Sequence, residues 1–313
     1  MKMLIKIAII GLGGVGGYYG GLLSRFSENN PGLLEVTFIV RGSHLEKINE
    51  QGLKVITETG TFTTHPYRAT AIAEEAGVMD YVILATKSYD LDAVAEQIRP
   101  MVGKSTILLP LLNGIDNVSR LRNLYPENEV WYGCAYIIAR LNEPGVVESS
   151  GNVHYLHFGH EKGTSPELQT IEELFVKAGI EASLKENALR AIWRKFFYIS
   201  TTAALTTHLN TTFRELVWNE EYSPLYRNLM QELYAVSVAE EVGLSEHIID
   251  DMMRYGGSLP EGTTSSMNSD YLAGRRIELE TLVGVVVQLA KKHRIAVPLY
   301  SMIYEKLKST LSD

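Results

Sequence analysis

One stretch of the sequence places a lysine where it could donate a proton. In IWRKFFYIS (192–200), Lys195 stands among apolar and aromatic residues. An ammonium group held near apolar side chains gives up its proton more readily, which suits protonation of a ketone oxygen. The simpler alternative is a lysine whose stem packs on the protein while its head reaches solvent, as we expect for Arg194.

Hydroxyl and carboxylate side chains gather in a second stretch, SSMNSDYLAGRRIELE (265–280). Ser265 or Ser266 is expected to cap a helix, and Glu278 is expected to start the next helix. The carboxylate of Glu278 could belong to a site, or it could serve only the electrostatics of a helix start.

A glycine-rich turn near the start could bind a dinucleotide. Gly11-Leu12-Gly13-Gly14-Val15-Gly16 matches G-x-G-x-x-G, between an apolar strand at 5–10 and a helix at 14–28, with another strand at 33–40. In such a βαβ unit Gly11 permits the turn, Gly13 lets N–H groups approach a diphosphate, and Gly16 lets the helix pack on the strand. The helix N-terminus adds partial positive charge. The alternative is a glycine-rich turn without a ligand.

The residue after the second strand indicates which dinucleotide binds. Where an NAD-binding chain usually carries Asp or Glu, this chain has Arg41, within VRGSH (40–44). A guanidinium beside a hydroxyl suits the 2′-phosphate of NADP, so we predict NADP(H) as the cofactor. Arg41 could instead be a solvated loop residue, and Ser43 with Glu46 fits a capping box for the next helix.

Two further polar residues follow predicted strands. Lys87 comes directly after the strand at 80–86, and Asn113 stands at the end of the strand at 105–114. Ligands of doubly wound sheets bind beyond the carboxyl ends of the strands, so we predict that both side chains line one cofactor and substrate crevice. Each could also be a polar residue that merely leaves a strand.

Composition excludes several classes of protein. The 313-residue chain is 45% hydrophobic and 21% charged, and its net charge of −8 gives little support to nucleic-acid binding. Cys134 lies in an apolar run and is predicted to be buried, while the histidines at 154, 157 and 160 lack the spacing of a metal site. No segment is apolar over a length that spans a bilayer, so we expect a cytoplasmic protein without a membrane partner.

The predicted secondary structure changes at about residue 185 from mixed strands and helices to helices alone. A strand pair at 52–68, strands at 130–137, 145–151 and 153–159, and a helix at 165–179 complete the first half. Helices are predicted in the second half at 187–209, 223–243, 245–256, 265–274, 277–295 and 298–311. We predict an α/β fold with a Rossmann-like doubly wound sheet over 1–185, an all-helical domain over 186–313, and an active site in the cleft between them. Apolar faces on the last helices allow a homodimer.

These blocks, in this order, resemble the ketopantoate reductase (2-dehydropantoate 2-reductase) family over essentially the whole chain. The resemblance is carried by GLGGVGG (11–17), VRG (40–42), ATKSYD (85–90), LLNGI (111–115), LRAIWRKF (189–196), SSMNSDYLAGRRIELE (265–280) and HRIAVP (293–298). It implies a 6-phosphogluconate-dehydrogenase-like arrangement of domains. It also implies NADPH-dependent reduction of a small 2-oxo acid, 2-dehydropantoate, to pantoate in pantothenate and coenzyme A biosynthesis.

The resemblance also implies a role for each candidate residue. Lys195 matches the general acid that protonates the carbonyl oxygen, and Glu278 matches the acid that contacts the substrate hydroxyl. Ser266 matches a hydroxyl that helps bind the substrate carboxylate, and Asn113 matches a residue beside the nicotinamide. Lys87 matches a lysine of the cofactor and substrate crevice, and Arg41 matches an arginine that selects NADP.

The chain departs from the family on the helix after Lys195. Well-known members carry asparagines four and eight residues on, where this chain has Ile199 and Ala203. Helical spacing puts Thr202 and Thr206 on roughly the same face as Lys195, so their hydroxyls could bind the substrate in place of the amides. Two alternatives therefore stay open, a reductase of a different branched 2-oxo acid and a non-catalytic NADP-binding sensor.

Overall fold

The chain forms two compact units, each with its own hydrophobic core. The computed structural model describes residues 4–311, apart from the side chain of Asn152. Unit 1 comprises the described residues up to Leu112 together with Asn117–Ala188, and unit 2 comprises Asn113–Asp116 together with the described residues from Leu189 onward. Unit 1 holds a parallel sheet and unit 2 is helical, so the predicted fold class is confirmed. No sequence pattern indicated that Asn113–Asp116 packs with unit 2.

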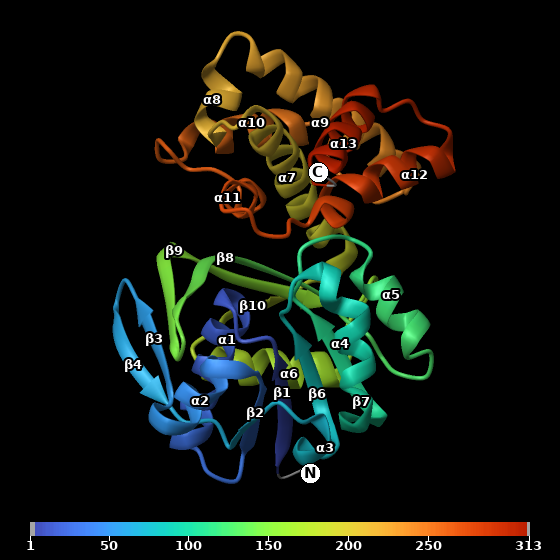
Figure 1. Cartoon of the computed structure of the whole chain (residues 1–313). Coiled ribbons are helices and arrows are strands. Elements are labelled where there is room, and N and C mark those ends of the chain that lie inside the picture. The colour runs from blue at the N-terminus through green and yellow to red at the C-terminus, as the bar shows by residue number, and fades with distance from the viewer. Residues whose placement is uncertain (1–3, 312–313) are drawn as a thin grey trace. The chain divides into compact units, whose positions relative to one another are not determined.

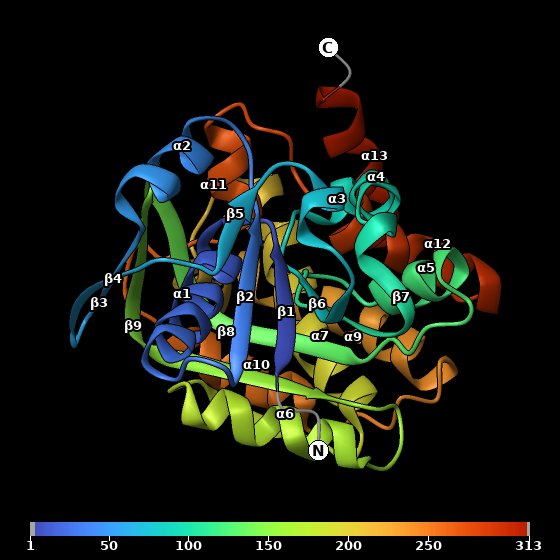
Figure 2. The same cartoon turned by 90° about the horizontal axis from the view of Figure 1, so that it is seen from below.

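The main sheet of unit 1 is parallel throughout (Figures 1 and 2). Its strands, in spatial order, are β5 (Arg68–Thr70), β2 (Leu34–Ile39), β1 (Ile5–Ile10), β6 (Met79–Leu84) and β7 (Val102–Pro110). The chain runs outward from β1 to β5 and then returns to β6 on the other side of β1. Strand order therefore reverses between β1 and β6, the kind of position where such sheets bind ligands.

A second sheet covers the other side of the first helix. Its order is β10 (Glu181–Leu184), β9 (Val146–Gly159), β3 (Leu53–Thr57) and β4 (Gly60–Thr64), and β8 (Tyr132–Glu143) pairs with β9. The antiparallel β3–β4 pair confirms the two strands predicted within 52–68. Cys134 on β8 is buried, as predicted.

The prediction of separate strands at 145–151 and 153–159 was wrong, because both belong to β9. The register of β8 against β9 shifts between Ile137 and Ile138, and Gly151 adopts φ +74°. A bulge of this kind bends a strand while the ladder continues on both sides. The sequence pattern breaks at the bend, so it indicated two strands.

Helix α1 (Gly14–Asn29) lies between the two sheets, and its glycines allow both contacts. A Cβ on Gly16 would lie 2.0 Å from the carbonyl oxygen of Gly11 on the side of the main sheet. A Cβ on Gly14 would lie 2.1 Å from the carbonyl oxygen of Ala139, and one on Gly17 would lie 2.4 Å from a methyl group of Val147. The glycines therefore serve two interfaces, where the sequence predicted packing on one strand.

Short helices connect the strands of unit 1. They are α2 (Gly42–Gln51), α3 (Ala73–Ala76), η1 (Ser88–Asp90), α4 (Leu91–Gln97), η2 (Arg99–Met101), α5 (Asn117–Leu124) and α6 (Pro166–Lys177). Ser165 caps α6 by accepting the Leu168 N–H, and Gly179 follows the helix with φ +82°, so this predicted helix is confirmed. The Ser43–Glu46 capping box is wrong, because α2 begins at Gly42 and its N-cap is Arg41, two residues before Ser43.

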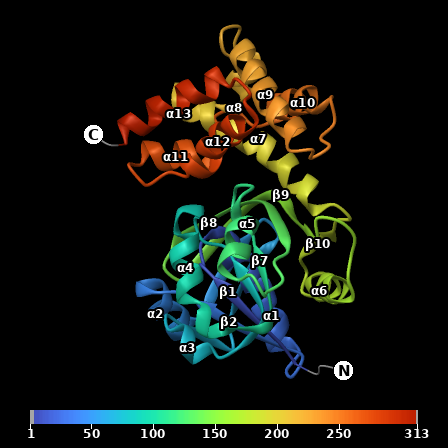
Figure 3. The ribbon, with the colours of Figure 1, turned by 90° about the vertical axis from the view of Figure 1, so that its right-hand side faces the viewer.

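Unit 2 is built from helices that share one hydrophobic core, and α9 contributes its apolar face to that core (Figure 3). The helices are α7 (Ala188–Leu209), α8 (Phe213–Trp218), α9 (Tyr222–Ala239), α10 (Ile248–Ser258), α11 (Ser266–Leu272), η3 (Glu280–Gly284), α12 (Val285–His293) and α13 (Pro298–Thr310). The predicted helices are confirmed with shifted ends, except that α8 was missed and η3 is a π-helix. Thr212 and Glu215 form a capping box, which is the signal that could have revealed α8.

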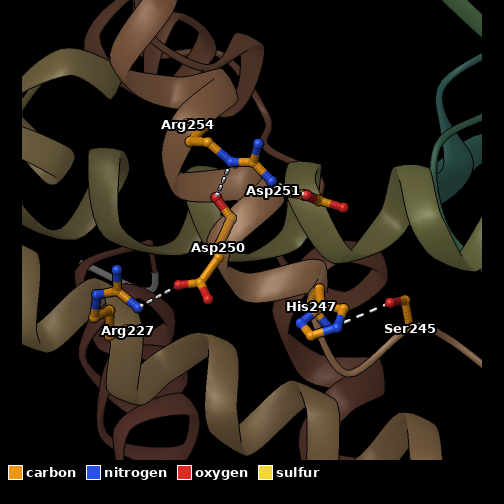
Figure 4. Close-up of polar contacts among 6 residues, drawn as sticks. All are labelled: Arg227, Ser245, His247, Asp250, Asp251 and Arg254. Carbon is orange, nitrogen blue, oxygen red and sulfur yellow. Dashed lines mark hydrogen bonds and ion pairs between the residues drawn. The ribbon is translucent and has the colours of Figure 1, made fainter.

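Charged side chains on α9 and α10 form ion pairs on the surface of unit 2 (Figure 4). Arg227 Nη1 lies 3.0 Å from Asp250 Oδ1, and Arg254 pairs with Asp251 one turn away. Exposed pairs of this type contribute at most about 1 kcal/mol to stability. The Arg227–Asp250 pair joins α9 to α10, whereas the Arg254–Asp251 pair lies within α10.

Neither a membrane-spanning helix nor a metal-binding cluster is found within residues 4–311. No helix there combines the length and apolar character needed to cross a membrane. Within the same range, no group of His, Cys, Asp and Glu side chains is arranged to hold a metal ion.

The packing of α1 predicts that alanine destabilises the protein at one of two adjacent glycines but not at the other. Gly14→Ala places a methyl group against the Ala139 carbonyl and should lower the free energy of unfolding by about 1–3 kcal/mol. Gly13→Ala is the matched control, because a Cβ at Gly13 meets nothing within 4 Å. Urea unfolding measures both variants, and equal stability of Gly14→Ala and the wild type would contradict this packing.

Candidate active site

Three of the predicted site residues come together within unit 2. Lys195 Nζ donates to Asn113 Oδ1 at 3.0 Å, and Asn113 Nδ2 donates to Glu278 Oε2 at 3.4 Å. Lys195 lies in the second turn of α7, Glu278 directly precedes the helical segment that contains η3, and Asn113 lies three residues beyond β7. One carboxamide therefore bridges an ammonium group and a carboxylate.

The bridge assigns a direction to each hydrogen bond. An ammonium group only donates, so the Asn113 oxygen must face Lys195, and its NH₂ group must then face Glu278. The Glu278 side chain is buried, with only 5% of the residue exposed. A buried carboxylate needs hydrogen-bond donors, and the Asn113 amide supplies one. The arrangement presents a proton donor and a hydrogen-bond acceptor in one small region.

The backbone beside Glu278 is fixed by a contact from α7. The Glu278 carbonyl accepts the Leu282 N–H at 2.9 Å, and the next turn is the π-helix η3. Ser200 Oγ donates to the Leu282 carbonyl at 2.6 Å and lies 2.8 Å from Tyr300 Oη. Burial raises the pKa of Tyr300, so its phenol stays protonated and donates to Ser200. Ser200 thus ties the helix that carries Lys195 to the turn that follows Glu278.

Ser200 was not predicted from the sequence. π-Turns reroute backbone hydrogen bonds and are frequent near functional sites, but no residue pattern marks them. The spacing of five residues between Lys195 and Ser200 gave no signal either, because Ser200 contacts Leu282, which lies 82 residues further along the chain.

Thr202 and Thr206, whose hydroxyls are predicted to bind the substrate, both donate to the backbone of their own helix. Both side chains are buried. Thr202 Oγ1 donates to the Tyr198 carbonyl at 2.7 Å, and Thr206 Oγ1 donates to the Thr202 carbonyl at 2.7 Å. A hydroxyl has one proton, and the helix backbone already takes it. The positions that depart from the family are apolar: Ala203 is buried in the helical core, and Ile199 packs against that core.

The paired serines before α11 have different environments. Ser265 is the N-cap: its Oγ accepts the Asn268 N–H at 3.0 Å and lies 2.7 Å from Thr206 Oγ1. Ser266 is the first residue of α11 and is exposed. Of the two, Ser266 is the hydroxyl with solvent access.

Unit 1 holds the candidate dinucleotide site. The loop from Gly11 to Gly16 follows β1, with Gly11 at φ +87°. The N-cap Gly13 has open space at its Cβ position, and the first turn of α1 contains no acidic residue. The N–H groups at the start of a helix, with room for a ligand beside Gly13, fit a diphosphate. The loop also leaves no space for a side chain at Gly11, where a Cβ would lie 2.7 Å from a Thr86 methyl group.

Arg41 and Lys87 lie at the same edge of the main sheet as this loop. Arg41 follows β2, which pairs in parallel with β1, and its exposed side chain makes no capping bond to α2. Lys87 follows β6, the other neighbour of β1, and immediately precedes η1. Parallel strands bring these cations to the carboxyl edge that the glycine loop occupies.

Comparison with known proteins identifies the family. The model described as Ketopantoate reductase PanE/ApbA matches residues 7–163, and the model described as Ketopantoate reductase PanE/ApbA C terminal matches residues 187–310. The chain belongs to the ketopantoate reductase family and is an oxidoreductase that acts on a CH–OH group.

Similar proteins match almost the full length. The 2-dehydropantoate 2-reductase of Mesorhizobium japonicum is 30% identical over 308 residues, 92% of each chain. The uncharacterized oxidoreductase YkpB of Bacillus subtilis is 28% identical over 305 residues, 97% of this chain and 98% of that protein.

Solved structures share the fold. The crystal structure of 2-dehydropantoate 2-reductase from Porphyromonas gingivalis W83 has a TM-score of 0.86 at 33% identity, and the match covers 97% of this chain and 99% of that one. A D-mandelate dehydrogenase, solved with NADH and anilino(oxo)acetate, has a TM-score of 0.85 at 22% identity, covering 98% and 99% of the two chains. The second likeness shows only that the fold is shared.

The contacts of α7 predict a difference between two buried hydroxyls. Ser200→Ala removes a donor to the Leu282 carbonyl and should lower the free energy of unfolding by about 1–3 kcal/mol. Thr207→Val is the control, because within the described structure the buried Thr207 hydroxyl has no hydrogen-bond partner. That variant should be neutral or stabilising. Denaturant unfolding measures the stability of both variants. A loss of stability in Thr207→Val but not in Ser200→Ala would contradict the assigned hydrogen bond from Ser200 to Leu282.

Proposed function

We propose that the protein reduces 2-dehydropantoate to pantoate with NADPH, a step in pantothenate and coenzyme A biosynthesis. The observation that carries the proposal is the Lys195–Asn113–Glu278 arrangement, with its proton donor and its acceptor joined by one amide. The names of relatives that match along the whole chain support the same substrate.

The glycine loop fits a nicotinamide dinucleotide. The N–H groups at the start of α1 would hold the diphosphate, since Gly13 leaves open the space that a Cβ would fill. The loop residues Leu12, Gly14 and Val15 would contribute backbone at this place. Arg41, beyond β2, would hold the 2′-phosphate and so favour NADPH over NADH. Bound NADPH would supply the hydride.

The substrate side of the proposal uses the residues of unit 2. Hydride addition builds negative charge on the ketone oxygen, and Lys195 would stabilise that charge and donate its proton to the oxygen. Glu278 would accept a hydrogen bond from the substrate hydroxyl. Ser266 would help bind the substrate carboxylate, and Asn113 would hold Lys195 and Glu278 in their relative positions.

A different branched 2-oxo acid is the second candidate substrate. The observation that favours it is apolar packing at Ile199 and Ala203, where well-known family members carry asparagines. The fold itself permits another substrate, since the D-mandelate dehydrogenase of similar fold was solved with anilino(oxo)acetate. The reaction type is the same under both candidates. The expected homodimer and cytoplasmic location stay predictions.

Replacing Lys195 tests the mechanism. Lys195→Ala should lower kcat for 2-dehydropantoate by about 100- to 10,000-fold, the usual contribution of a general acid, and should leave NADPH binding unchanged. Arg194→Ala, which removes the exposed cation one residue earlier, is the matched control and should keep the wild-type rate. The loss of absorbance of NADPH gives kcat, and fluorescence titration gives the dissociation constant.

Two results would count against the proposal. A Lys195→Ala rate close to that of the wild type would remove Lys195 from the chemistry. A wild-type protein that binds NADPH but turns over no 2-oxo acid would instead be the non-catalytic sensor.

A further inference from the structure

A buried histidine of unit 1, outside the residues used so far, joins three segments around the glycine loop. His44 lies in the first turn of α2 and is 8% exposed. Its Nε2 lies 2.9 Å from the Leu12 carbonyl oxygen, and its Nδ1 lies 2.8 Å from the Gly145 nitrogen, in the turn between β8 and β9. Both ring nitrogens are therefore committed to backbone groups.

The partners determine the tautomer of the ring. A backbone N–H can only donate, so Nδ1 must accept from Gly145, and the single ring proton must lie on Nε2 and point at Leu12. Burial lowers the pKa of His44, and this favours the neutral ring that the two bonds need. The charged side chains on the segments packed around the ring are exposed to solvent: Arg41, Glu46, Lys47, Lys54 and Glu143.

The turn that contacts His44 is itself anchored. The Gly145 carbonyl accepts the Lys54 N–H of β3 at 2.9 Å, and Gly145 adopts φ +84°. A Cβ at this position would lie 3.0 Å from the Cβ of Lys47 on α2. The donor that fixes the histidine ring is thus held in place by a strand on one side and a helix on the other.

The contact with Leu12 determines where the next N–H points. The Leu12 carbonyl and the Gly13 N–H belong to one planar trans peptide group, and they point in opposite directions. His44 holds the carbonyl on the protein side, so the Gly13 N–H faces away from His44. Gly13 is also the N-cap of α1, with open space at its Cβ position.

We infer that His44 is a positioning residue of the cofactor site, which fixes the Leu12–Gly13 peptide so that its N–H is presented to the diphosphate of the dinucleotide. The inference rests on the proposed NADPH-dependent function. His44 acts through the backbone of the loop and touches no reacting atom. The same side chain also ties α2, whose N-cap is Arg41, to the loop, so the two proposed phosphate contacts share one anchor.

Three substitutions separate the two hydrogen bonds. His44→Gln keeps an N–H donor near the Nε2 position and so can retain the bond to Leu12. His44→Asn keeps only an acceptor near the Nδ1 position, which can retain the bond to Gly145, and His44→Leu removes both. His65→Gln is the matched control, because His65 is an exposed histidine of the same unit that pairs with Glu28.

The readouts are the NADPH dissociation constant by fluorescence titration and the KM values of both substrates. His44→Leu and His44→Asn should weaken NADPH binding by roughly 10-fold or more, the effect of losing one ordered hydrogen bond. The KM of the 2-oxo acid should not change. His44→Gln should restore NADPH binding to near the wild-type value, and His65→Gln should not differ from it.

Each outcome decides between the inference and the proposed function. If folded His44→Leu binds NADPH with wild-type affinity, the inference is overturned and the proposed function is not affected. If His44→Leu does not fold, equal NADPH affinities of His44→Gln and His44→Asn overturn the inference in the same way. A wild-type protein that does not bind NADPH overturns the proposed cofactor, and the inference with it. Long-range ¹H–¹⁵N NMR of the wild type should show the Nε2–H tautomer for His44, and an Nδ1–H tautomer would contradict the assigned contacts.

Discussion

The carboxamide of Asn113 is the group on which the organisation of the candidate site depends. It accepts a hydrogen bond from Lys195 and donates one to Glu278, so a single amide contacts both a cation and an anion. In the proposed reaction the ammonium would donate its proton to the carbonyl oxygen, and the carboxylate would accept a hydrogen bond from the substrate hydroxyl. Asn113–Asp116 packs with unit 2, the unit that also carries Lys195 and Glu278.

The proposed cofactor site, at the glycine loop, also depends on groups that other segments hold in place. The glycine loop has no side chains that could position a diphosphate, so its backbone must be held by other segments. Gly11 and Gly16 hold it by close packing, and His44 holds it by a hydrogen bond to Leu12. On α7, Ser200 has a corresponding function, since it fixes the π-turn that follows Glu278. Histidine and serine side chains thus fix two backbone segments that contain no catalytic group.

The features that could be predicted from the sequence are those that depend on residues close together in the chain. The β1–α1–β2 unit, the cations beyond strands β2 and β6, and the long helix that carries Lys195 follow from periodicity and glycine spacing. The bridge through Asn113 could not be predicted, because it joins residues 82 and 165 positions apart, beyond any local pattern. The hydroxyls of Thr202 and Thr206 donate to the backbone of their own helix, which the sequence could not indicate, because helical spacing gives the face of a helix but not the partner of a hydroxyl. The π-turn and the bend in β9 arise from packing between distant segments.

The choice of substrate is the central claim. The measurement that tests it most directly is kcat/KM of the wild-type protein for 2-dehydropantoate and a panel of other branched 2-oxo acids, each with NADPH and with NADH. The account predicts the highest value for 2-dehydropantoate with NADPH. A higher value for another acid would contradict the assigned substrate and leave the proton chemistry of Lys195 in place, and a preference for NADH would contradict the role of Arg41.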